Sequence, residues 1–308
     1  MEGTVVLKKI VPVLGVLIIV ILTFSYAFKE TNKISTRYLS ENAPANVSNQ
    51  AGPPVSSGPV VDVPWLNNES FQKAQAQYNT PVQLAAFCTV LHDPLPGEEH
   101  NVHRAAEILA GTVVKPGKIF SMNNTIGPYK GPKGFQAGPV YIGSELRTTV
   151  GGGVCKMAST LYNVAILSNL PVVERHPHSM PVPYVPLGQD ATVNTGVADI
   201  RFKNDRPTPI LIWAQGVDNR LYVAFYGQEP APVVEWHHEI LEKYSTRVVY
   251  RHNPSLPKGS EKIVVQGMDG ALVKSWITIK NGDGTTIVKQ LGVDSYKPLP
   301  TVVERHKG

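Results

Sequence analysis

The chain has 308 residues, of which 42% are hydrophobic and 17% charged, values typical of globular proteins long enough for two compact domains. Its net charge of +5 comes without a long run of lysine or arginine, so the sequence gives no sign of nucleic-acid binding. The small basic excess would favour approach to anionic cell-wall polymers, but ordinary solvated charge is the simpler explanation. Two cysteines are too few for a disulfide framework or a Cys-rich metal site.

The N-terminal region predicts a membrane anchor followed by a stalk. Residues 10–28 are almost wholly apolar and follow Lys8-Lys9, and a run of this length can cross the hydrocarbon core of a bilayer as a helix. We therefore assign residues 1–28 to an uncleaved single-span anchor; the alternative is a secretory signal cleaved near Ser25-Tyr26-Ala27. Residues 29–63, rich in Asn, Ser, Pro and Gly, are expected to form a flexible stalk. Both alternatives place the remaining domains outside the cytoplasmic membrane.

Residues 64–229 are expected to form an α+β domain in which helices are followed by an antiparallel sheet. Helical patterns occur at 102–109 and after Cys155. Strands are predicted, from β-branched and aromatic residues between turn residues, at 81–89, 182–184, 191–193, 199–202, 210–214 and 221–226. Asp218-Asn219 is expected to join the last two strands as a hairpin, and the helix after Cys155 is expected to pack on the sheet.

A glycine-rich motif, Gly151-Gly152-Gly153-Val154-Cys155, is the most informative stretch of this domain. Glycine lets the backbone turn tightly and approach a ligand closely, because it has no Cβ. The residues after Cys155 suit a helix, so the cysteine lies where a turn becomes the first helical turn. Unpaired backbone N–H groups and the helix dipole favour a thiolate there, which predicts a nucleophile. A buried structural cysteine is the alternative from the motif alone.

Several ordered blocks between about residues 85 and 227 resemble the VanW family, which is named after an accessory protein of vancomycin-resistance clusters. The blocks are Phe87-Cys88-Thr89, Pro116-Gly117-Lys118-Ile119-Phe120-Ser121-Met122-Asn123, Gly127-Pro128, Gly134-Phe135-Gln136-Ala137, the glycine-cysteine motif, Glu174-Arg175 with His178-Ser179, the run 184–193 and the run 199–204. The resemblance implies the fold of that family and a connection with the Gram-positive cell wall, and it leaves the activity open. Lys156 stands where the family usually has a glutamine.

Roles follow if this domain is an enzyme. Cys155 would attack a carbonyl carbon, while its own amide and those of Gly151, Gly152 and Gly153 stabilise the oxyanion. His178 or His176 would act as base, with His178 preferred because it belongs to the family motif. Asp190 or Asp199 would orient the imidazole. The remaining ligand-binding candidates are Glu174, Arg175 and Asn204, for which an ion pair, turns and strand-end caps are the structural alternatives. The layout resembles that of papain-like hydrolases as an analogy of arrangement only.

We expect neither a metal nor a cofactor. His92, His100 and His103 lack a helical register and have no cysteine beside them. Cys88 lies in an apolar run and is expected to be a buried spectator, although a Cys88–Cys155 disulfide is possible outside the cytoplasm.

Residues 230–308 are expected to form a small all-β module that begins after Pro230-Ala231-Pro232. Strands are predicted at 246–250, 262–266, 273–279 and 286–290. The module resembles the G-five domain of Gram-positive surface proteins through Leu256-Pro257-Lys258-Gly259, Val265-Gln266-Gly267, Asp269-Gly270 and the run 298–303. That resemblance implies binding to polymers that contain N-acetylglucosamine; the alternative is a spacer without a ligand.

The sequence as a whole predicts a single-pass cell-membrane protein whose C-terminal domains face the cell wall and act on or bind peptidoglycan. One class is a Cys-dependent amide hydrolase or transpeptidase-like enzyme. The alternatives are a non-catalytic protein that binds peptidoglycan or another wall glycan, and a scaffold for cell-wall assembly. The residues leave open whether the chain is an enzyme.

Overall fold

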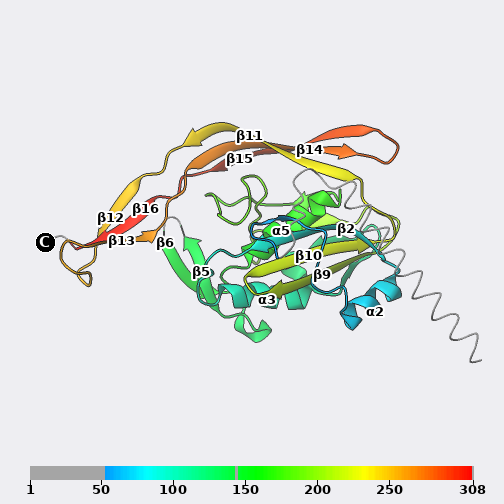
Figure 1. The fold of residues 1–308 in the computed structure, drawn as a ribbon, viewed down its shortest axis with the longest axis horizontal. Helices are drawn as coiled ribbons and strands as arrows, with labels where there is room; N and C mark the ends of the chain where they lie inside the picture. The colour runs from blue at the N-terminus through cyan, green and yellow to red at the C-terminus, as the bar shows by residue number, and fades with distance from the viewer. Residues whose placement is uncertain (1–52, 143–144, 307–308) are drawn as a thin grey trace, which may run out of the picture.

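The computed structural model describes residues 53–142 and 145–306. The predicted anchor and most of the predicted stalk lie outside the described residues. Within the described ranges, no helix is both long enough and apolar enough to cross a membrane. These ranges have an α+β fold, with few helices and mostly antiparallel sheets, as the sequence predicted (Figure 1).

A five-stranded antiparallel sheet is the centre of the first domain. In sheet order its strands are β1 (Gly58–Pro59), β2 (Val82–Val90), β10 (Arg220–Gly227), β9 (Ile210–Val217) and β3 (Thr112–Val114). Successive side chains of a strand point to opposite faces. On β10, Val223 and Phe225 join one hydrophobic cluster, whereas Tyr222 and Ala224 join another on the opposite face. The sheet is therefore buried on both sides.

Helices cover both faces of this sheet. They are α2 (Glu69–Tyr78), α3 (Glu98–Leu109), the short α4 (Met122–Thr125) and α5 (Cys155–Leu167), together with a 3-10 turn at Gly131–Lys133. Helices α3 and α5 pack on the face of Val223, and α2 packs on the other face through Phe71. Asn68 caps the N-terminus of helix α2, because its side chain accepts a hydrogen bond from the Phe71 amide at 3.0 Å.

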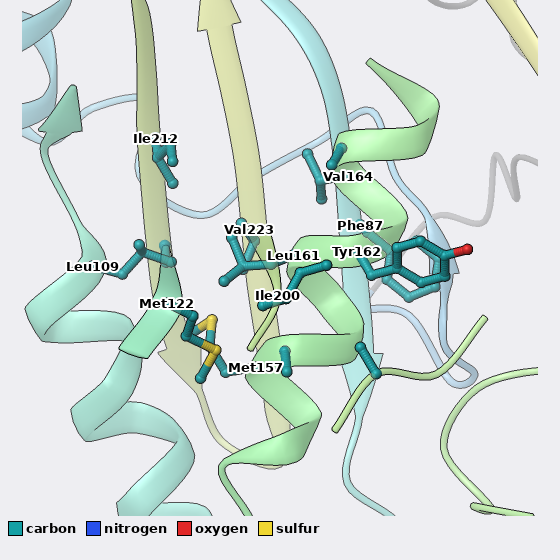
Figure 2. Packing of buried hydrophobic residues seen from close by; sticks show 14 of the residues in the cluster. Phe87, Leu109, Met122, Met157, Leu161, Tyr162, Val164, Ile200, Ile212 and Val223 are labelled. Carbon is teal, nitrogen blue, oxygen red and sulfur yellow. The ribbon is translucent and has the colours of Figure 1, made fainter. Parts of the chain in front are cut away.

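Helix α5 is buried on all sides. Every residue from 157 to 166 is buried, so the helix lacks the polar stripe of a surface helix. Figure 2 shows Leu161 of α5 pointing toward the strand that carries Val223. The opposite side of α5 is covered by the C-terminal module, where Trp236 packs edge-on against Tyr162 with ring centroids 5.3 Å apart. Cys155 therefore begins a rigid element in the middle of the molecule.

Two smaller sheets complete the first domain. One has the order β4 (Ile119–Ser121), β8 (Arg201–Lys203) and β7 (Val172–Glu174), and the other is the hairpin of β5 (Ala137–Ile142) and β6 (Glu145–Val150). The hairpin ends at the glycine turn that leads into α5. The long connection between β7 and β8, residues 175–200, contains His178 and Asp190 and lacks regular strands.

The C-terminal module is all-β, as predicted. Its strands form two three-stranded sheets, β11 (Val233–Tyr244), β14 (Gly270–Lys280) and β15 (Thr286–Tyr296) in one, and β12 (Val248–His252), β16 (Thr301–Arg305) and β13 (Glu261–Val265) in the other. The pair β12–β16 is parallel, while the other pairs are antiparallel. The ribbon of the first sheet passes over α5 (Figure 1). Val234, Ile277 and Ile279 of this ribbon belong to the hydrophobic cluster that contains α3 and α5. The two predicted domains therefore share one core.

Most predicted elements are present, but two predicted strands are wrong. The strands at 182–184 and 191–193 are irregular chain in the structure. Pro181, Pro183 and Pro186 each lack a backbone N–H, so this stretch cannot donate to a strand ladder at those positions. The prediction that helices precede the sheet is also incomplete, because β2 comes before α3 and α5 and pairs with β10. Helix α2 and strands β11 and β16 were not predicted.

Candidate active site

The three glycines before Cys155 are required by close packing of the backbone. A Cβ on Gly152 would lie 2.2 Å from the carbonyl oxygen of Gly138, inside van der Waals contact. Gly151 and Gly153 have φ values of +81° and +95°, a region that other residues rarely adopt. The turn therefore fits tightly against the β5–β6 hairpin and delivers the chain into α5.

The start of α5 provides donors for a negative charge. The residue before the helix, Val154, offers no side-chain cap. The amides of Gly151 and Gly152 donate to the carbonyls of Gln136 and Thr149, whereas those of Gly153 and Cys155 have no acceptor within the described part of the chain. Cys155 is half-buried, and its sulfur lies 3.8 Å from the carbonyl oxygen of Val193. An anion beside this thiol would meet the positive end of the helix dipole.

His178 connects Cys155 to Asp190. The imidazole lowers the pKa of the thiol, and the thiol raises the pKa of the imidazole, so the two groups interact electrostatically. The other side of the ring, Nδ1, lies 2.6 Å from Asp190 Oδ2, which also accepts from the backbone amide of His178 at 2.6 Å. Because Nδ1 faces the carboxylate, Nε2 is the nitrogen available to the sulfur. Asp190 is 1% exposed, so the carboxylate is shielded from water.

The charges of this arrangement favour an ion pair. Burial opposes ionisation of Cys155, but the hydrogen bond and charge of His178, with the charge of Lys156, lower the pKa of the thiol below its usual value. Burial also opposes protonation of His178, yet Asp190 and Cys155 raise its pKa to about 9. For Asp190, burial is outweighed by His178 and Arg175, so its pKa is lowered. These directions favour the thiolate form of Cys155, the imidazolium form of His178 and the carboxylate form of Asp190.

Asp190 is held from its other side by residues that include the C-terminal module. Tyr296 donates its hydroxyl to Asp190 Oδ1 at 2.5 Å, and Arg175 donates to the same oxygen at 3.1 Å. Arg175 also donates to both carboxylate oxygens of Asp294, at 2.7 and 2.6 Å. Both Tyr296 and Asp294 lie on β15. The carboxylate oriented toward His178 is thus fixed by two segments more than a hundred residues apart in the sequence.

Lys156 takes part in a second buried ion pair beside the thiol. Its ammonium group contacts Glu98 and lies 4.7 Å from the centre of the Tyr184 ring. The Lys156 and Glu98 side chains are only 14% and 11% exposed. Tyr184 in turn contacts the His178 ring edge-on, with centroids 6.5 Å apart. The Lys156 ammonium group and the Tyr184 ring therefore line one side of the site. Lys156 is the position at which the family that this chain resembles usually has a glutamine.

The other predicted site residues have partners of their own. His176 pairs with Glu174 at 3.1 Å, and no contact links it to Cys155 within the described residues. Asp199 accepts from the Ser121 hydroxyl at 2.5 Å and from the Asn123 amide at 3.0 Å, which caps α4. Of the two predicted pairs, the structure therefore brings His178 and Asp190 to the cysteine and places His176 and Asp199 elsewhere.

Glu174 and Asn204 make internal contacts. Glu174 pairs with Arg201 at 3.2 Å rather than with its neighbour Arg175. Asn204 is fully buried, and its amide donates to the carbonyls of Val114 and Thr208 at 2.8 and 2.9 Å. These contacts hold β8 and the loop after it in place.

The cysteines are both free, so the possible Cys88–Cys155 disulfide is absent. Cys88 is buried on the α2 side of the sheet, and burial raises the pKa of its thiol to about 12. No group of three metal-ligating side chains occurs among residues 53–142 and 145–306.

Sequence reasoning missed Tyr296 and Asp294. Both lie between the predicted strand at 286–290 and the quoted run 298–303. Only the three-dimensional fold brings Tyr296 to Asp190 and Asp294 to Arg175. Lys156 was noticed only as a departure from the family pattern, and its partner Glu98 was not identified.

A hollow of about 490 Å³ begins one residue after His178 and runs between that loop and the C-terminal module. Its lining comprises Ser179, Met180, Ser245, Arg247, Lys297, Pro298, Leu299 and Pro300. The lining carries two cationic side chains and no carboxylate. Lys297 also links the two sides of the hollow, because its backbone amide on the module donates to the carbonyl of Ser179 on the loop at 2.8 Å.

The family model described as VanW like protein matches residues 97–226. These residues form a VanW-like domain. The domain contains Cys155, His178 and Asp190, whereas Asp294 and Tyr296 lie outside the matched range.

Two curated relatives match part of the chain. Uncharacterized protein YoaR of Bacillus subtilis is 35% identical over 147 residues, which is 48% of this chain and 48% of the relative. The Vancomycin B-type resistance protein VanW of Enterococcus faecalis is 29% identical over 126 residues, which is 39% of this chain and 46% of the relative. The chain spans about half the length of the curated relatives it matches.

Two solved structures are similar to about a quarter of the chain. They are described as the crystal structure of HP0197-G5 and the IgA1 protease G5 domain structure, with 16% and 19% identity over 24% and 27% of this chain and 95% and 100% of those chains. Their TM-scores are 0.14 and 0.17, so the likeness carries no argument about the fold.

Proposed function

We propose that this chain is a cysteine-dependent acyl-transfer enzyme of the cell envelope that acts on amide bonds in the peptides of peptidoglycan. The observation that carries the proposal is the His178 imidazole, which is held by Asp190 at 2.6 Å and lowers the pKa of the Cys155 thiol at the start of α5. A thiolate at a helix start with an imidazolium beside it is an activated nucleophile. The reaction is hydrolysis when water accepts the acyl group and transpeptidation when an amine accepts it.

The steps follow from the geometry. The Cys155 thiolate attacks the carbonyl carbon, and the oxyanion forms near the unpaired amides of Gly153 and Cys155. The C–N bond then breaks, and the amine leaves with the proton of the His178 imidazolium, which leaves a thioester on Cys155. Neutral His178 next takes a proton from water or from an incoming amine, whose attack releases the acyl group and restores the thiolate. Asp190 keeps Nδ1 of His178 protonated and Nε2 directed at the sulfur throughout.

The test is formation of the thioester. Purified protein is incubated with soluble peptidoglycan fragments, and its intact mass and the released products are measured. We expect an acyl adduct on Cys155 that is absent from Cys155→Ser and retained in Cys88→Ser, the matched control for the second thiol. A wild-type protein that forms neither adduct nor product with any stem-peptide fragment contradicts the proposal.

A second function, binding of wall polymer without chemistry, is favoured by the hollow beside His178. Arg247 and Lys297 supply positive charge to a concave surface, which suits an anionic polymer or a peptide carboxylate. This function predicts normal wall binding by Cys155→Ser, and it becomes the leading proposal if the thioester is not formed.

We also propose that the folded domains lie outside the cytoplasmic membrane. The apolar run at residues 10–28 and the name of the Enterococcus faecalis relative, a vancomycin resistance protein, support an envelope location. Protease added to intact protoplasts should digest the module at residues 230–308. Full protection of this module, with digestion after lysis, contradicts the orientation.

A further inference from the structure

The connection 175–200 contacts the C-terminal module at two places, which are called here the His178 loop (residues 178–179) and the Asp190 loop (residues 187–190). On the Asp190 loop, the Gly188 amide donates to the Tyr296 hydroxyl at 2.9 Å, and the Gln189 side-chain nitrogen lies 2.9 Å from His238 Nε2 on β11. On the His178 loop, the carbonyl of Ser179 accepts from the Lys297 amide at 2.8 Å. The module therefore contacts both loops within two residues of the imidazole and the carboxylate.

The contact at Gly188 is too close for any other residue. Gly188 has a φ of +87°, and a Cβ there would lie 2.4 Å from the Ser275 hydroxyl on β14. Leu187 beside it packs on the buried cluster of Ala271, Val273 and Tyr296. The path of the Asp190 loop is thus set by the surface of the module and not by the loop itself.

Tyr296 is the central contact of this interface. Its side chain is 1% exposed, and its hydroxyl accepts from the Gly188 amide while it donates to Asp190 Oδ1. Burial and the charge of Asp190 raise the pKa of this phenol, so it keeps its proton and remains a donor at every physiological pH. Its two shorter hydrogen bonds therefore go to the Asp190 loop, while a longer contact of 3.4 Å joins the hydroxyl to Asp294 on the same strand.

We propose that Tyr296 is a positioning residue for the His178–Asp190 pair, and that the C-terminal module thereby forms part of the reactive centre of the VanW-like domain. The hydroxyl holds Asp190 Oδ1, so that Oδ2 stays on Nδ1 and on the amide of His178. Asp294 has a supporting role, because it holds the Arg175 guanidinium that donates to the same Oδ1. This inference rests on the proposed function for its catalytic consequence, but the positioning itself is independent of it.

The other charged or titratable groups around His178 and Asp190 come from each element packed on these two residues. They are Cys155 and Lys156 from α5, Glu98 from α3, Arg175, Tyr184 and Tyr162. None of these donates to Asp190 Oδ1 except Arg175, so within the described residues Tyr296 and Arg175 are the two donors to that oxygen.

The test uses Tyr296→Phe in the full chain, with Cys88→Ser as background. Phenylalanine keeps the buried ring and removes only the hydroxyl, so the fold is retained. Tyr244→Phe is the matched control, because Tyr244 lies on the same module and its hydroxyl contacts only Glu242. Asp294→Asn and its control Asp283→Asn, in the exposed 281–285 turn, form a second pair. Two quantities are measured: the titration of the His178 imidazole by NMR, assigned with His178→Gln, and the iodoacetamide alkylation rate of Cys155 against pH.

We expect Tyr296→Phe to lower the His178 pKa toward its ordinary value, because Asp190 is no longer held on the ring. The alkylation rate at pH 7 should fall about tenfold, the order expected when one hydrogen bond to a charged group is lost. The Tyr244→Phe control should match the parent in both measurements. A His178 pKa that is unchanged or raised in Tyr296→Phe overturns the proposal, since a raised value would mean that the hydroxyl only withdraws charge from Asp190.

The two proposals fail in different ways. If the parent Cys155 has an ordinary thiol pKa, the enzyme proposal fails, and the NMR titration still decides whether Tyr296 positions His178. If the parent thiol is activated and Tyr296→Phe leaves both measurements unchanged, the positioning role fails and the enzyme proposal stands.

Discussion

Oδ2 of Asp190 accepts hydrogen bonds from both the backbone amide and the imidazole Nδ1 of His178, each at 2.6 Å. One oxygen thus fixes the main chain and the side chain of the same histidine. Rotation of the ring would break the second bond while the first held the backbone, so the imidazole has one stable orientation. That orientation directs Nε2 at Cys155, and it depends on the carboxylate being ionised and held in place.

Alkylation of Cys155 tests the ion pair directly. We expect rapid reaction with iodoacetamide near neutral pH, because the pKa of this thiol is lowered. Labelling should disappear in Cys155→Ser and persist in Cys88→Ser, since burial raises the Cys88 pKa to about 12. His178→Ala should move the midpoint of the rate profile to higher pH, because the thiolate loses its imidazolium partner. A profile with an ordinary thiol midpoint in the wild type, unmoved by His178→Ala, would exclude the dyad.

Replacement of Asp190 tests the orienting carboxylate. In Asp190→Asn the residue keeps its shape but loses the charge that fixes the tautomer, so acyl transfer should fall about 10³- to 10⁴-fold, as in other triads. Asp199→Asn is the matched control, because Asp199 caps α4 and has no contact with His178 within the described residues. The measurement is the rate of thioester formation for each folded variant. Equal losses in the two variants would show that neither carboxylate has the orienting role.

The same substitution changes how stability depends on pH. The folded-state pKa of Asp190 is lowered, so the folded protein binds fewer protons here than the unfolded chain. Its contribution is therefore complete above the ordinary carboxyl pKa of about 4 and is lost as pH falls through the lowered value. Denaturant unfolding should show Asp190→Asn less stable than wild type by about 3 kcal/mol at pH 7, with a smaller difference at pH 3. A difference that grows toward acid contradicts this assignment.

The sequence located Cys155 better than the residues that surround it. Cys155 follows a local motif, three glycines and a helical pattern, and local patterns are visible in one sequence. Asp190 and Asp199 could not be separated, because both follow His178 in the sequence and both belong to blocks that resemble the same family. The choice depends on how the 175–200 loop is folded, and contacts from Tyr296 and Lys297 set that path. Contacts over such sequence separations carry no local pattern.

The elements of the fold divide in the same way, into those that a local sequence pattern marks and those that depend on distant contacts. Strands β9 and β10 and helix α5 were predicted because buried runs and turns mark them locally. The false strands at 182–184 and 191–193 have apolar residues, and Pro183 interrupts the first of them. Packing in the cluster that contains α5 buries Tyr184, Ala191 and Val193 without a strand ladder. Strand β11 was missed because polar residues such as His237, Glu239 and Glu242 obscure the alternation of apolar and polar side chains that marks a strand. Its pairing with β14 stabilises it instead.

Substitution of Gly152 tests the packing of the turn. A Cβ on Gly152 would overlap the carbonyl of Gly138 and would also lie too close to the carbonyl oxygen of Pro139. Gly152→Ala should lower the free energy of unfolding by about 2–3 kcal/mol and reduce the reactivity of Cys155, because the start of α5 must shift. Gly282→Ala is the control, since nothing lies within 4 Å of a Cβ there. Thermal unfolding compares the stability of the two variants. Equal melting temperatures would show that the glycine turn is not required by packing.

Charge removal tests whether the hollow beside His178 binds wall polymer. Arg247 and Lys297 line it with no carboxylate beside them, so an anionic ligand would be attracted most strongly at low salt. The double variant Arg247→Gln with Lys297→Gln should pellet less with isolated peptidoglycan than the wild type at low salt, by about tenfold in affinity if each charge contributes about 0.7 kcal/mol. The matched control removes two exposed lysines elsewhere on the module, Lys258→Gln with Lys262→Gln, and has the same net charge. If both double variants lose binding equally, the attraction comes from net charge alone; if neither loses any, the hollow has no part in wall binding, and substrate must reach Cys155 from another side.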